Sequence, residues 1–367
     1  MVSDGRVFSG KRILLTGHTG FKGSWLAEWL LSLGAEVHGL SLPAAPGAHF
    51  EQLGLAGRME HRLGDIREAA IVAARVAEVQ PDFVFHLAAQ AVVRPSYAAP
   101  LETFATNVTG TTHLLAALHG LARPCAVVVV TSDKCYLNHE SGRLYREEDA
   151  LGGRDPYSAS KAAAELVVAS WRDSFFPADK IAAGTVPPVG IATARAGNAI
   201  GGGDWAEDRI VPDCVRALEK NAPIRVRNPG AVRPWQHVLE PLGGYLMLAE
   251  AIYGALQARS AERLAGVCSA FNFGPAPEDH RSVADLVAEW LKHWPGRWED
   301  ASDPAAPHEA HRLHLATDRA HARLGWAPRW GFATAVAQTA EWYRTPPSEA
   351  LAATRRQIVA YTAGALE

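Results

Sequence analysis

Cysteine is scarce in this sequence, and its spacing forms no motif. The four cysteines, Cys125, Cys135, Cys214 and Cys268, are scattered over 367 residues, and none belongs to a CxxC pair. Such spacing favours neither a zinc site nor a disulfide framework. We therefore expect no metal centre, and a reducing cytoplasmic location fits best.

Long apolar runs and an excess of charge of one sign are also lacking. No stretch approaches the roughly 18 apolar residues of a membrane helix, and the first ten residues lack a basic segment followed by an apolar run. The formal net charge of -3 gives no broad basic field for nucleic acid or an anionic membrane. We therefore expect no secretion, no membrane partner and no nucleic-acid partner, and any anionic ligand must be bound by local cations.

What the sequence does have is an alternation of short apolar runs with longer amphipathic segments. The apolar runs predict strands at about 12–16, 36–41, 60–63, 82–87 and 125–131. The segments between them predict crossover helices at 22–33, 67–79 and 100–121. This alternation is typical of an α/β fold, a Rossmann-like doubly wound parallel sheet covered on both faces.

The character of the chain changes after its first half. A further helix is predicted from Asp155-Pro156 to about Ser174, and a sixth strand from Val189 to Arg195. Beyond the glycines at 201–203, short strands and Trp- and Pro-containing loops predict a smaller C-terminal lobe over the carboxyl edge of the sheet. The expected division is a Rossmann domain at 1–198 and about 238–270, with the lobe at 199–237 and 271–367.

A glycine-rich turn, GHTGFKG, follows the first predicted strand. Glycine lets the backbone turn tightly and approach a pyrophosphate, while the following helix offers free amide groups and a partial positive charge. A glycine pattern by itself also suits an ordinary turn, so the later motifs decide. The predicted dinucleotide contacts in this turn are Gly17, Thr19, Gly20, Phe21, Lys22 and Gly23.

The ends of the next strands predict the rest of the dinucleotide site. An acidic residue would normally hold the ribose of NAD at the end of the second strand, but Leu40-Ser41-Leu42 stands there, and no arginine lies nearby for the 2′-phosphate of NADP. This favours NAD, with Ser41 at the strand end. Asp65 and Ile66 are expected to meet the adenine edge. The floor beside the cofactor is assigned to Leu87, Ala88 and Ala89.

The strongest local pattern is YSASK, in which Tyr157 and Lys161 lie four residues apart. That spacing places both side chains on one helix face. Free tyrosine titrates near pH ~10, so a base that works near neutrality needs its pKa lowered by about 3, or ~4 kcal/mol. The neighbouring ammonium and an oxidised nicotinamide ring are expected to supply this. A chance pair on an exposed helix is the alternative, and the order of the motifs weighs against it.

The segment TSDKCY directly follows the apolar strand CAVVVV. The carboxyl end of a strand is where an open parallel sheet places its ligands. Ser132 is expected to hydrogen-bond the hydroxyl that Tyr157 deprotonates, while Asp133 and Lys134 add an acid and a base that simple alcohol oxidation does not need. A surface ion pair at the strand end is the alternative.

The order of these motifs resembles the extended short-chain dehydrogenase/reductase family of NAD-dependent nucleotide-sugar epimerases and dehydratases, and within it the dehydratases of CDP-linked glucose. The matching segments run from about Lys11 to Trp330 and are GHTGFKGSWL, TSDKCY, DPYSASKAAAE, RAGNAIGGGDWAEDRIVPD, RPWQHVLEPLGGYL and FNFGP. The resemblance implies a lyase that binds NAD and a nucleotide-diphosphate sugar, CDP-glucose first. It also implies a homodimer or homotetramer and a role in deoxysugar synthesis for lipopolysaccharide O-antigen.

The resemblance further implies the course of the reaction. Tyr157 would remove the C4 hydroxyl proton while NAD takes the C4 hydride, and the resulting ketone acidifies C5. Lys134 would then take the C5 proton, Asp133 would protonate the leaving C6 hydroxyl, and the hydride would return to C6. No net cofactor is consumed.

Discrete cations must meet the charges of a nucleotide diphosphate, because the protein has no general basic field. Arg209 and Arg233 are the best candidates, since guanidinium groups match phosphate oxygens. Asn198 resembles the family asparagine at the diphosphate. Arg94 and Tyr97 are expected to border the hexose.

Three further features are weighed as packing or surface. Trp205 and His237 are expected to pack the lobe interface rather than frame the base. His308 and His311 are three apart, not four, so they do not form the helical zinc-protease pattern and are assigned to the surface. Phe271 stands where relatives usually carry tryptophan, so we expect the base-facing contacts to differ.

Two other functions fit parts of the pattern. A nucleotide-sugar C4 epimerase shares the fold, NAD and the Tyr-Lys pair but has no use for Asp133 and Lys134. A redox-sensing protein that binds NAD without catalysis would tend to lose the tyrosine or the lysine, and Tyr157 and Lys161 are both present. The sequence therefore favours a 4,6-dehydratase.

Overall fold

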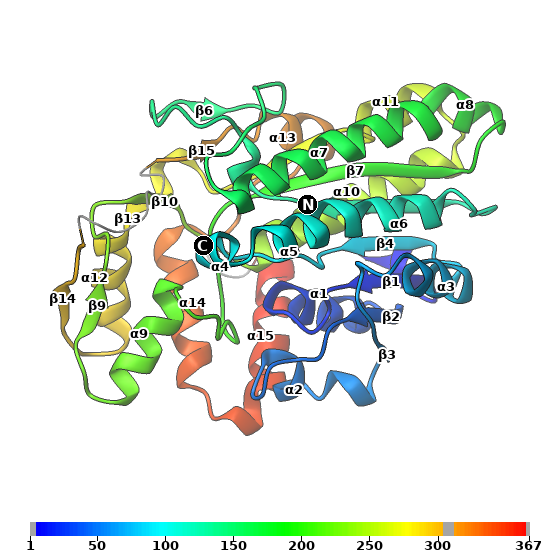
Figure 1. The fold of residues 1–367 in the computed structure, drawn as a ribbon. Coiled ribbons are helices and arrows are strands. Elements are labelled where there is room, and N and C mark those ends of the chain that lie inside the picture. Colours follow the sequence, from blue (N-terminus) through cyan, green and yellow to red (C-terminus); the bar gives the residue numbers. More distant parts are fainter. Residues whose placement is uncertain (1–4, 304–311, 365–367) are drawn as a thin grey trace.

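A seven-stranded sheet runs through the larger part of the computed structural model, which describes residues 5–303 and 312–364 (Figure 1). The strand order is β3-β2-β1-β4-β5-β7-β12, and every neighbouring pair is parallel. The strands are β1 (Arg12–Thr16), β2 (Glu36–Ser41), β3 (Glu60–Leu63), β4 (Phe83–His86), β5 (Cys125–Val130), β7 (Val189–Ala196) and β12 (Ala270–Phe273). The expected doubly wound α/β architecture is confirmed.

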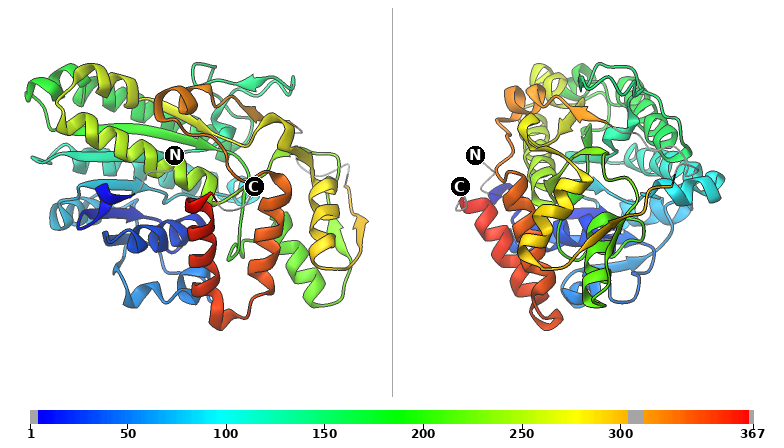
Figure 2. Two further views of the ribbon diagram at one scale, coloured as in Figure 1. Left: turned by 180° about the vertical axis from the view of Figure 1, so that it is seen from behind. Right: turned by 90° about the vertical axis from the view of Figure 1, so that its left-hand side faces the viewer.

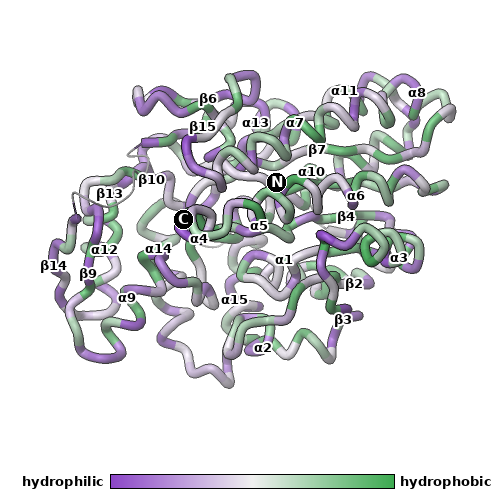
Figure 3. The backbone as a smooth tube through the Cα atoms, viewed as in Figure 1, coloured by the Kyte–Doolittle hydropathy of each residue, from purple (hydrophilic) through white to green (hydrophobic). Residues whose placement is uncertain are grey.

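Helices cover both faces of this sheet. On one face α3 (Ala69–Val79), α6 (Gly110–Leu118) and α7 (Pro156–Phe175) pack side by side, and the other face carries α1 (Phe21–Ser32) and α10 (Leu239–Gln257), as the views from the front and from behind show (Figures 1 and 2). Strands covered on both sides become apolar throughout, and CAVVVV in β5 is buried over its first five residues. Hydrophobic colour accordingly follows the central elements in Figure 3, whereas the loops around β6 and β14 are mostly hydrophilic.

The helix that carries the Tyr-Lys pair begins where the sequence predicts. The Asp155 side chain accepts a hydrogen bond from the Ser158 amide at 2.9 Å, and Pro156 occupies the first turn, where it needs no amide donor. Tyr157 is therefore placed in the first turn of α7, and its own amide donates to the Ser96 hydroxyl at 3.1 Å. The first turn of α7, and with it the backbone position of Tyr157, is therefore fixed by contacts within the protein.

The segment 100–121 is not the single helix that its periodicity predicts. α5 (Pro100–Phe104) and α6 are separated by a π-helical turn at Ala105–Thr109. Within this turn the Asn107 amide donates to the Ser160 hydroxyl at 2.8 Å, and its oxygen accepts from the Gln90 amide at 2.9 Å. A turn with an extra residue often marks a functional region. Here a tertiary contact to α7 overrides the local helical period.

The smaller lobe lies beside the carboxyl ends of the strands, at the left of Figure 1. Its elements are α9 (Ile210–Glu219), β9 (Ile224–Val226), β10 (Val232–Pro234), β13 (His280–Ser282), α12 (Val283–His293), β14 (Trp298–Asp300) and α14 (Phe332–Arg344). β12, a strand of the central sheet, crosses the boundary expected at residue 270. α15 (Ala350–Ala363) returns to α1, where Arg355 donates to the buried Glu28 carboxylate at 2.7 Å. The division into two domains remains a prediction.

The remaining elements are short connections. They are α2 (His49–Gln52), α4 (Val93–Ala98), α8 (Ala178–Ala183), α11 (Ala261–Val267), α13 (Asp318–Leu324), β6 (Leu144–Tyr145), β8 (Ala199–Ile200), β11 (Gln236–His237) and β15 (His314–Leu315). Among the described residues, no helix combines the length and the apolar character needed to cross a membrane.

Candidate active site

A cavity of about 1000 Å³ lies where the strands of the sheet end, between the sheet and the smaller lobe. Its lining includes residues that directly follow β1, β2, β4, β5 and β7. This is the crevice in which open parallel sheets bind ligands. All the dinucleotide, chemical and substrate residues predicted from the sequence line it.

The glycine turn after β1 forms one wall of the cavity and admits no side chain at two positions. Gly17 has a φ of +76°, and a Cβ on it would lie 2.6 Å from the amide nitrogen of Ala88. A Cβ on Gly23 would lie 2.1 Å from the Gly17 carbonyl oxygen. The backbone of the turn, the start of α1 and the end of β4 are thereby brought into close contact. This cradle fits a dinucleotide, because pyrophosphate needs a close backbone approach and the free amides of a helix start.

Hydroxyl groups lie at the end of β2, where an acidic residue usually binds the ribose of NAD. The Ser41 and Thr19 hydroxyl oxygens are 2.6 Å apart, and Thr19 donates to the carbonyl of Leu42 at 3.0 Å. The chain has no arginine close in sequence to the end of β2, but Arg67 lines the same cavity. Its Nε donates to Asp65 at 2.8 Å, and this pairing lowers the pKa of the Asp65 carboxyl. Arg67 is distant in sequence from the end of β2, so the strand-end motif does not reveal it.

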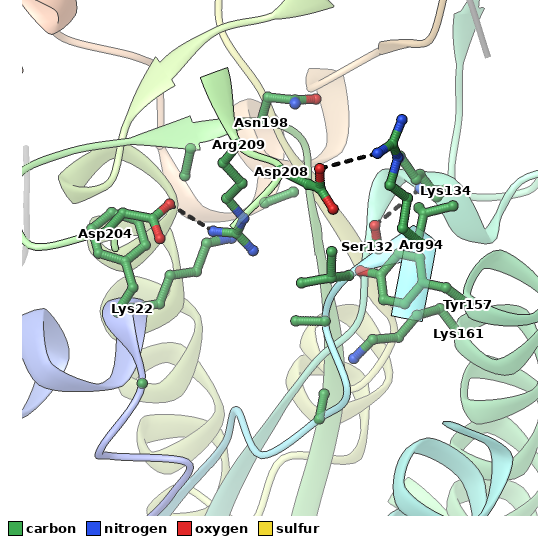
Figure 4. A pocket seen from close by; sticks show the side chains of 18 of the residues that line it. Lys22, Arg94, Ser132, Lys134, Tyr157, Lys161, Asn198, Asp204, Asp208 and Arg209 are labelled. Carbon is green, nitrogen blue, oxygen red and sulfur yellow. Dashed lines mark hydrogen bonds and ion pairs between the residues drawn. The ribbon is translucent and has the colours of Figure 1, made fainter. Parts of the chain in front are cut away.

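The chemical residues meet on one side of the cavity, and Lys22, Asp204 and Arg209 lie opposite them (Figure 4). Ser132 donates to Asp133 at 3.0 Å and accepts from the amide of Lys134 at 3.2 Å, at the start of a 3₁₀ turn at Asp133–Cys135. The residue types predicted for proton transfer therefore share one space.

Burial sets the protonation of this side of the site. It raises the pKa of Tyr157 to about 12, although the Ser132 hydroxyl, through its hydrogen bond to the phenol, lowers it. In the protein alone, desolvation of the phenolate is the larger effect. The lowering expected from the neighbouring ammonium together with an oxidised nicotinamide ring stays a prediction. Burial also lowers the pKa of Lys161 to about 8 and raises that of Asp133.

Two of the three predicted substrate arginines pair with carboxylates, and the third, Arg233, donates to the carbonyl of Val232 at 3.2 Å. Arg209 donates to Asp204 at 2.8 Å, and Arg94 donates to Asp208 at 3.2 Å across the mouth of the cavity (Figure 4). Arg227, which the sequence reasoning missed, also lines the cavity and binds Asp208. Both carboxylates lie in the loop before α9, and no local sequence pattern predicts these ion pairs.

Two aromatic residues that were expected to pack at the lobe interface do pack against other aromatic rings. The His237 ring is fully buried between Trp25 and Trp330, and Trp205 packs edge-on against Tyr343. Phe271 is buried in β12 and does not line the cavity, so it gives no reason to expect different base-facing contacts.

Two expectations concern metal ions. His308 and His311 lie outside the described residues. Within residues 5–303 and 312–364 no group of three or more His, Cys, Asp or Glu side chains could hold a metal ion.

Comparison with known proteins places this fold and site among sugar-nucleotide enzymes. The family model described as GDP-mannose 4,6 dehydratase matches residues 14–261. The CDP-glucose 4,6-dehydratase of Salmonella typhimurium is 45% identical over 348 residues, covering 93% of this chain and 92% of that protein. The dTDP-glucose 4,6-dehydratase of Streptomyces antibioticus is 30% identical, covering 90% and 92%. The chain belongs to this family of nucleotide-sugar 4,6-dehydratases.

A solved structure supports the same fold. The dTDP-glucose 4,6-dehydratase of Bacillus anthracis, in complex with NAD, superposes with a TM-score of 0.71 over 90% of this chain and 96% of that one. The sequence identity is 19%, so this likeness concerns the fold alone.

Proposed function

We propose that the protein converts CDP-glucose into a CDP-linked 4-keto-6-deoxy sugar, with NAD bound in the glycine cradle. The observation that carries this proposal is the meeting of the Ser132–Lys134 turn with Tyr157 and Lys161 in one cavity. The 45% identity to a CDP-glucose 4,6-dehydratase supports the choice of nucleotide and sugar. The glycine cradle would hold NAD, which would supply the hydride acceptor for C4 and the hydride donor for C6 of the sugar.

The side chains have separate tasks in this reaction. Tyr157 accepts the C4 hydroxyl proton, Ser132 orients that hydroxyl, and the Lys161 ammonium stabilises the phenolate. Lys134 takes the proton from C5 and gives it back to C5 when the hydride reaches C6. Asp133 protonates the leaving C6 hydroxyl, and burial suits it for this task because a raised pKa keeps a carboxyl protonated closer to neutral pH.

The substrate is held by the cations opposite this side. Arg209, Arg233 and Asn198 bind the diphosphate, and Arg94 and Tyr97 border the hexose. Arg233 is buried in the cavity wall at 7% exposure, where a charged hydrogen bond to phosphate is stronger than at the surface. Binding then requires Arg209 to share or exchange its contact with Asp204.

The assembly is proposed to be a homodimer, or a tetramer built from such dimers. α5 and α7 lie in contact and expose apolar side chains, with Leu101 86% and Leu166 61% exposed. Phe104 and Phe175 add to the same two helices. Pairing of these helices about a two-fold axis would bury those side chains.

A panel of nucleotide sugars tests the substrate. We expect CDP-glucose to be turned over with the highest kcat/KM, and the product to show the alkaline absorbance of a 4-keto-6-deoxy sugar. GDP-mannose and dTDP-glucose, the substrates named in related enzymes, serve as matched alternatives. Release of a C4 epimer from CDP-glucose without loss of water would instead identify an epimerase.

The activity is expected to fall as the pH rises through about 8. Burial, followed by repulsion from the Lys22 ammonium, lowers the pKa of Lys161 to about 8, so its charge is present below that pH and lost above it. Burial lowers the pKa of Lys22 to about 8 as well, and its loss of charge falls in the same range. Without the ammonium the Tyr157 phenolate loses its stabilising cation. A kcat profile from about pH 6 to about pH 10 measures this limb, and a flat profile up to the upper limit would exclude it.

A further inference from the structure

A buried ion pair lies behind the strand end that carries Ser132. Glu165 from α7 and Arg195 from β7 are each 3% exposed, and Nη2 of Arg195 donates to Oε2 of Glu165 at 2.8 Å. The Thr131 hydroxyl donates to Oε1 at 2.5 Å, and the Thr193 hydroxyl donates to Oε2 at 2.8 Å. Burial would raise the pKa of Glu165, but Arg195 and the two hydroxyls outweigh it and hold the pKa below its usual value. Glu165 is therefore a charged carboxylate with both oxygens bonded.

The glutamate fastens α7 to the end of β5. Lys161 donates from Nζ to the carbonyl of Val130 at 3.2 Å, and Glu165, one helical turn later, accepts from the hydroxyl of Thr131. Two consecutive residues of the strand end are thus bonded to one face of the helix. The next residue along the chain is Ser132.

The arginine fastens the other end of the same turn. Its Nη1 donates to the Tyr136 hydroxyl at 2.8 Å, and its guanidinium lies over the Tyr136 ring, 4.9 Å from the centroid. The Tyr136 hydroxyl in turn donates to Asn272 of β12 at 2.7 Å. Tyr136 directly follows the 3₁₀ turn at Asp133–Cys135. The segment from Thr131 to Tyr136 is therefore anchored at both ends to one ion pair.

We propose that Glu165 and Arg195 are positioning residues, which hold the Ser132–Lys134 segment in register with Tyr157 and Lys161. This inference rests on the proposed function, because it takes these five residues as the reacting set. Neither Glu165 nor Arg195 lines the cavity in the described structure, so both act through their neighbours.

Stability alone does not explain such a pair. A buried ion pair generally stabilises a fold no more than well-packed apolar side chains of the same volume. Its bonds here have a direction that apolar contacts lack, and they join the two elements that carry the chemistry. Reacting groups must be held within about 0.5 Å of their working geometry, and a displacement of ~1 Å costs about 100-fold in rate.

Two threonines that donate to the same carboxylate provide the test. Thr131→Val removes the bond beside Ser132, and Thr193→Val removes the matching bond on β7, away from the cavity. We expect both variants to lower the urea midpoint of unfolding by similar amounts. Thr131→Val should lower kcat about 10- to 100-fold with KM nearly unchanged, Thr193→Val should keep kcat within about twofold, and Thr131→Ser should restore most of the wild-type kcat.

The outcomes separate this proposal from the proposed function. Equal losses of kcat in Thr131→Val and Thr193→Val would mean that the ion pair only stabilises the fold, and this would overturn the proposal. So would a crystal structure of Thr131→Val in which Ser132–Lys134 keep their positions, whether or not the protein is active. Wild-type protein that turns over no nucleotide sugar would overturn the proposed function, while the displacement of Ser132–Lys134 in the variant would still decide the positioning role.

Discussion

Replacement of Tyr157 by phenylalanine is expected to lower kcat by about 10³-fold, within the range observed when a general base is removed. The ring stays in place, because Tyr157 is only 8% exposed and its backbone amide donates to the Ser96 hydroxyl, a bond that does not need the phenol oxygen. What is lost is the oxygen that accepts the C4 hydroxyl proton, and with it the hydride transfer that depends on that proton. Steady-state kinetics with CDP-glucose measure the loss of kcat, and thermal unfolding checks that the fold is intact.

A second buried tyrosine provides the matched control. Tyr245 on α10 is fully buried, does not line the cavity, and its hydroxyl has no hydrogen-bond partner among the described residues. Tyr245→Phe should therefore leave kcat unchanged and should not destabilise the protein, since it removes an unsatisfied polar group. A Tyr157→Phe variant that retains kcat within about threefold would remove Tyr157 from the proton-transfer step.

The sheet could be predicted closely because its strands are buried on both faces. Such strands are uniformly apolar and short, and the five strands expected before residue 132 all appear within one residue of their predicted ends. The helix at 100–121 was predicted less well. Its π-helical turn depends on the contact of Asn107 with Ser160, 53 positions further along the chain, which no local period records.

The sequence predicted which residues line the candidate site, but it did not predict the pKa values of their side chains. The motifs follow strands of the predicted parallel sheet, and the carboxyl ends of those strands share one edge. The expected residues could therefore be assigned to one cavity. The raised pKa of Tyr157 was missed, since it arises from desolvation and therefore from the completed fold. Arg67 and Glu165 were missed for a related reason. Their partners are defined by loop and strand-end geometry. Arg67 lies outside the matching motifs, and Glu165 ends the DPYSASKAAAE motif without any local pattern that identifies its partners.

Replacement of Lys134 by methionine is expected to separate the first half of the reaction from the second. Methionine keeps much of the side-chain volume but has no group that can accept the C5 proton. Oxidation at C4 depends on Tyr157 and Lys161 and should proceed, so a single turnover should leave the 4-keto sugar bound together with reduced nicotinamide. The loss of water should slow by about 10²- to 10⁴-fold, the usual contribution of a general base. Nicotinamide absorbance follows the first step, and the alkaline absorbance of the product follows the second.

The control for this variant is a lysine far from the chemistry. Lys180 is exposed on α8 and does not line the cavity, so Lys180→Met should turn over like the wild type. If Lys134→Met formed the 4-keto-6-deoxy product at the wild-type rate, the C5 proton would have to leave by another base in the cavity. If it lost both steps together, Lys134 would act in binding or in C4 oxidation. Only a stalled, oxidised sugar agrees with the role that its place beside Asp133 indicates, because elimination needs both a base at C5 and an acid at the C6 oxygen.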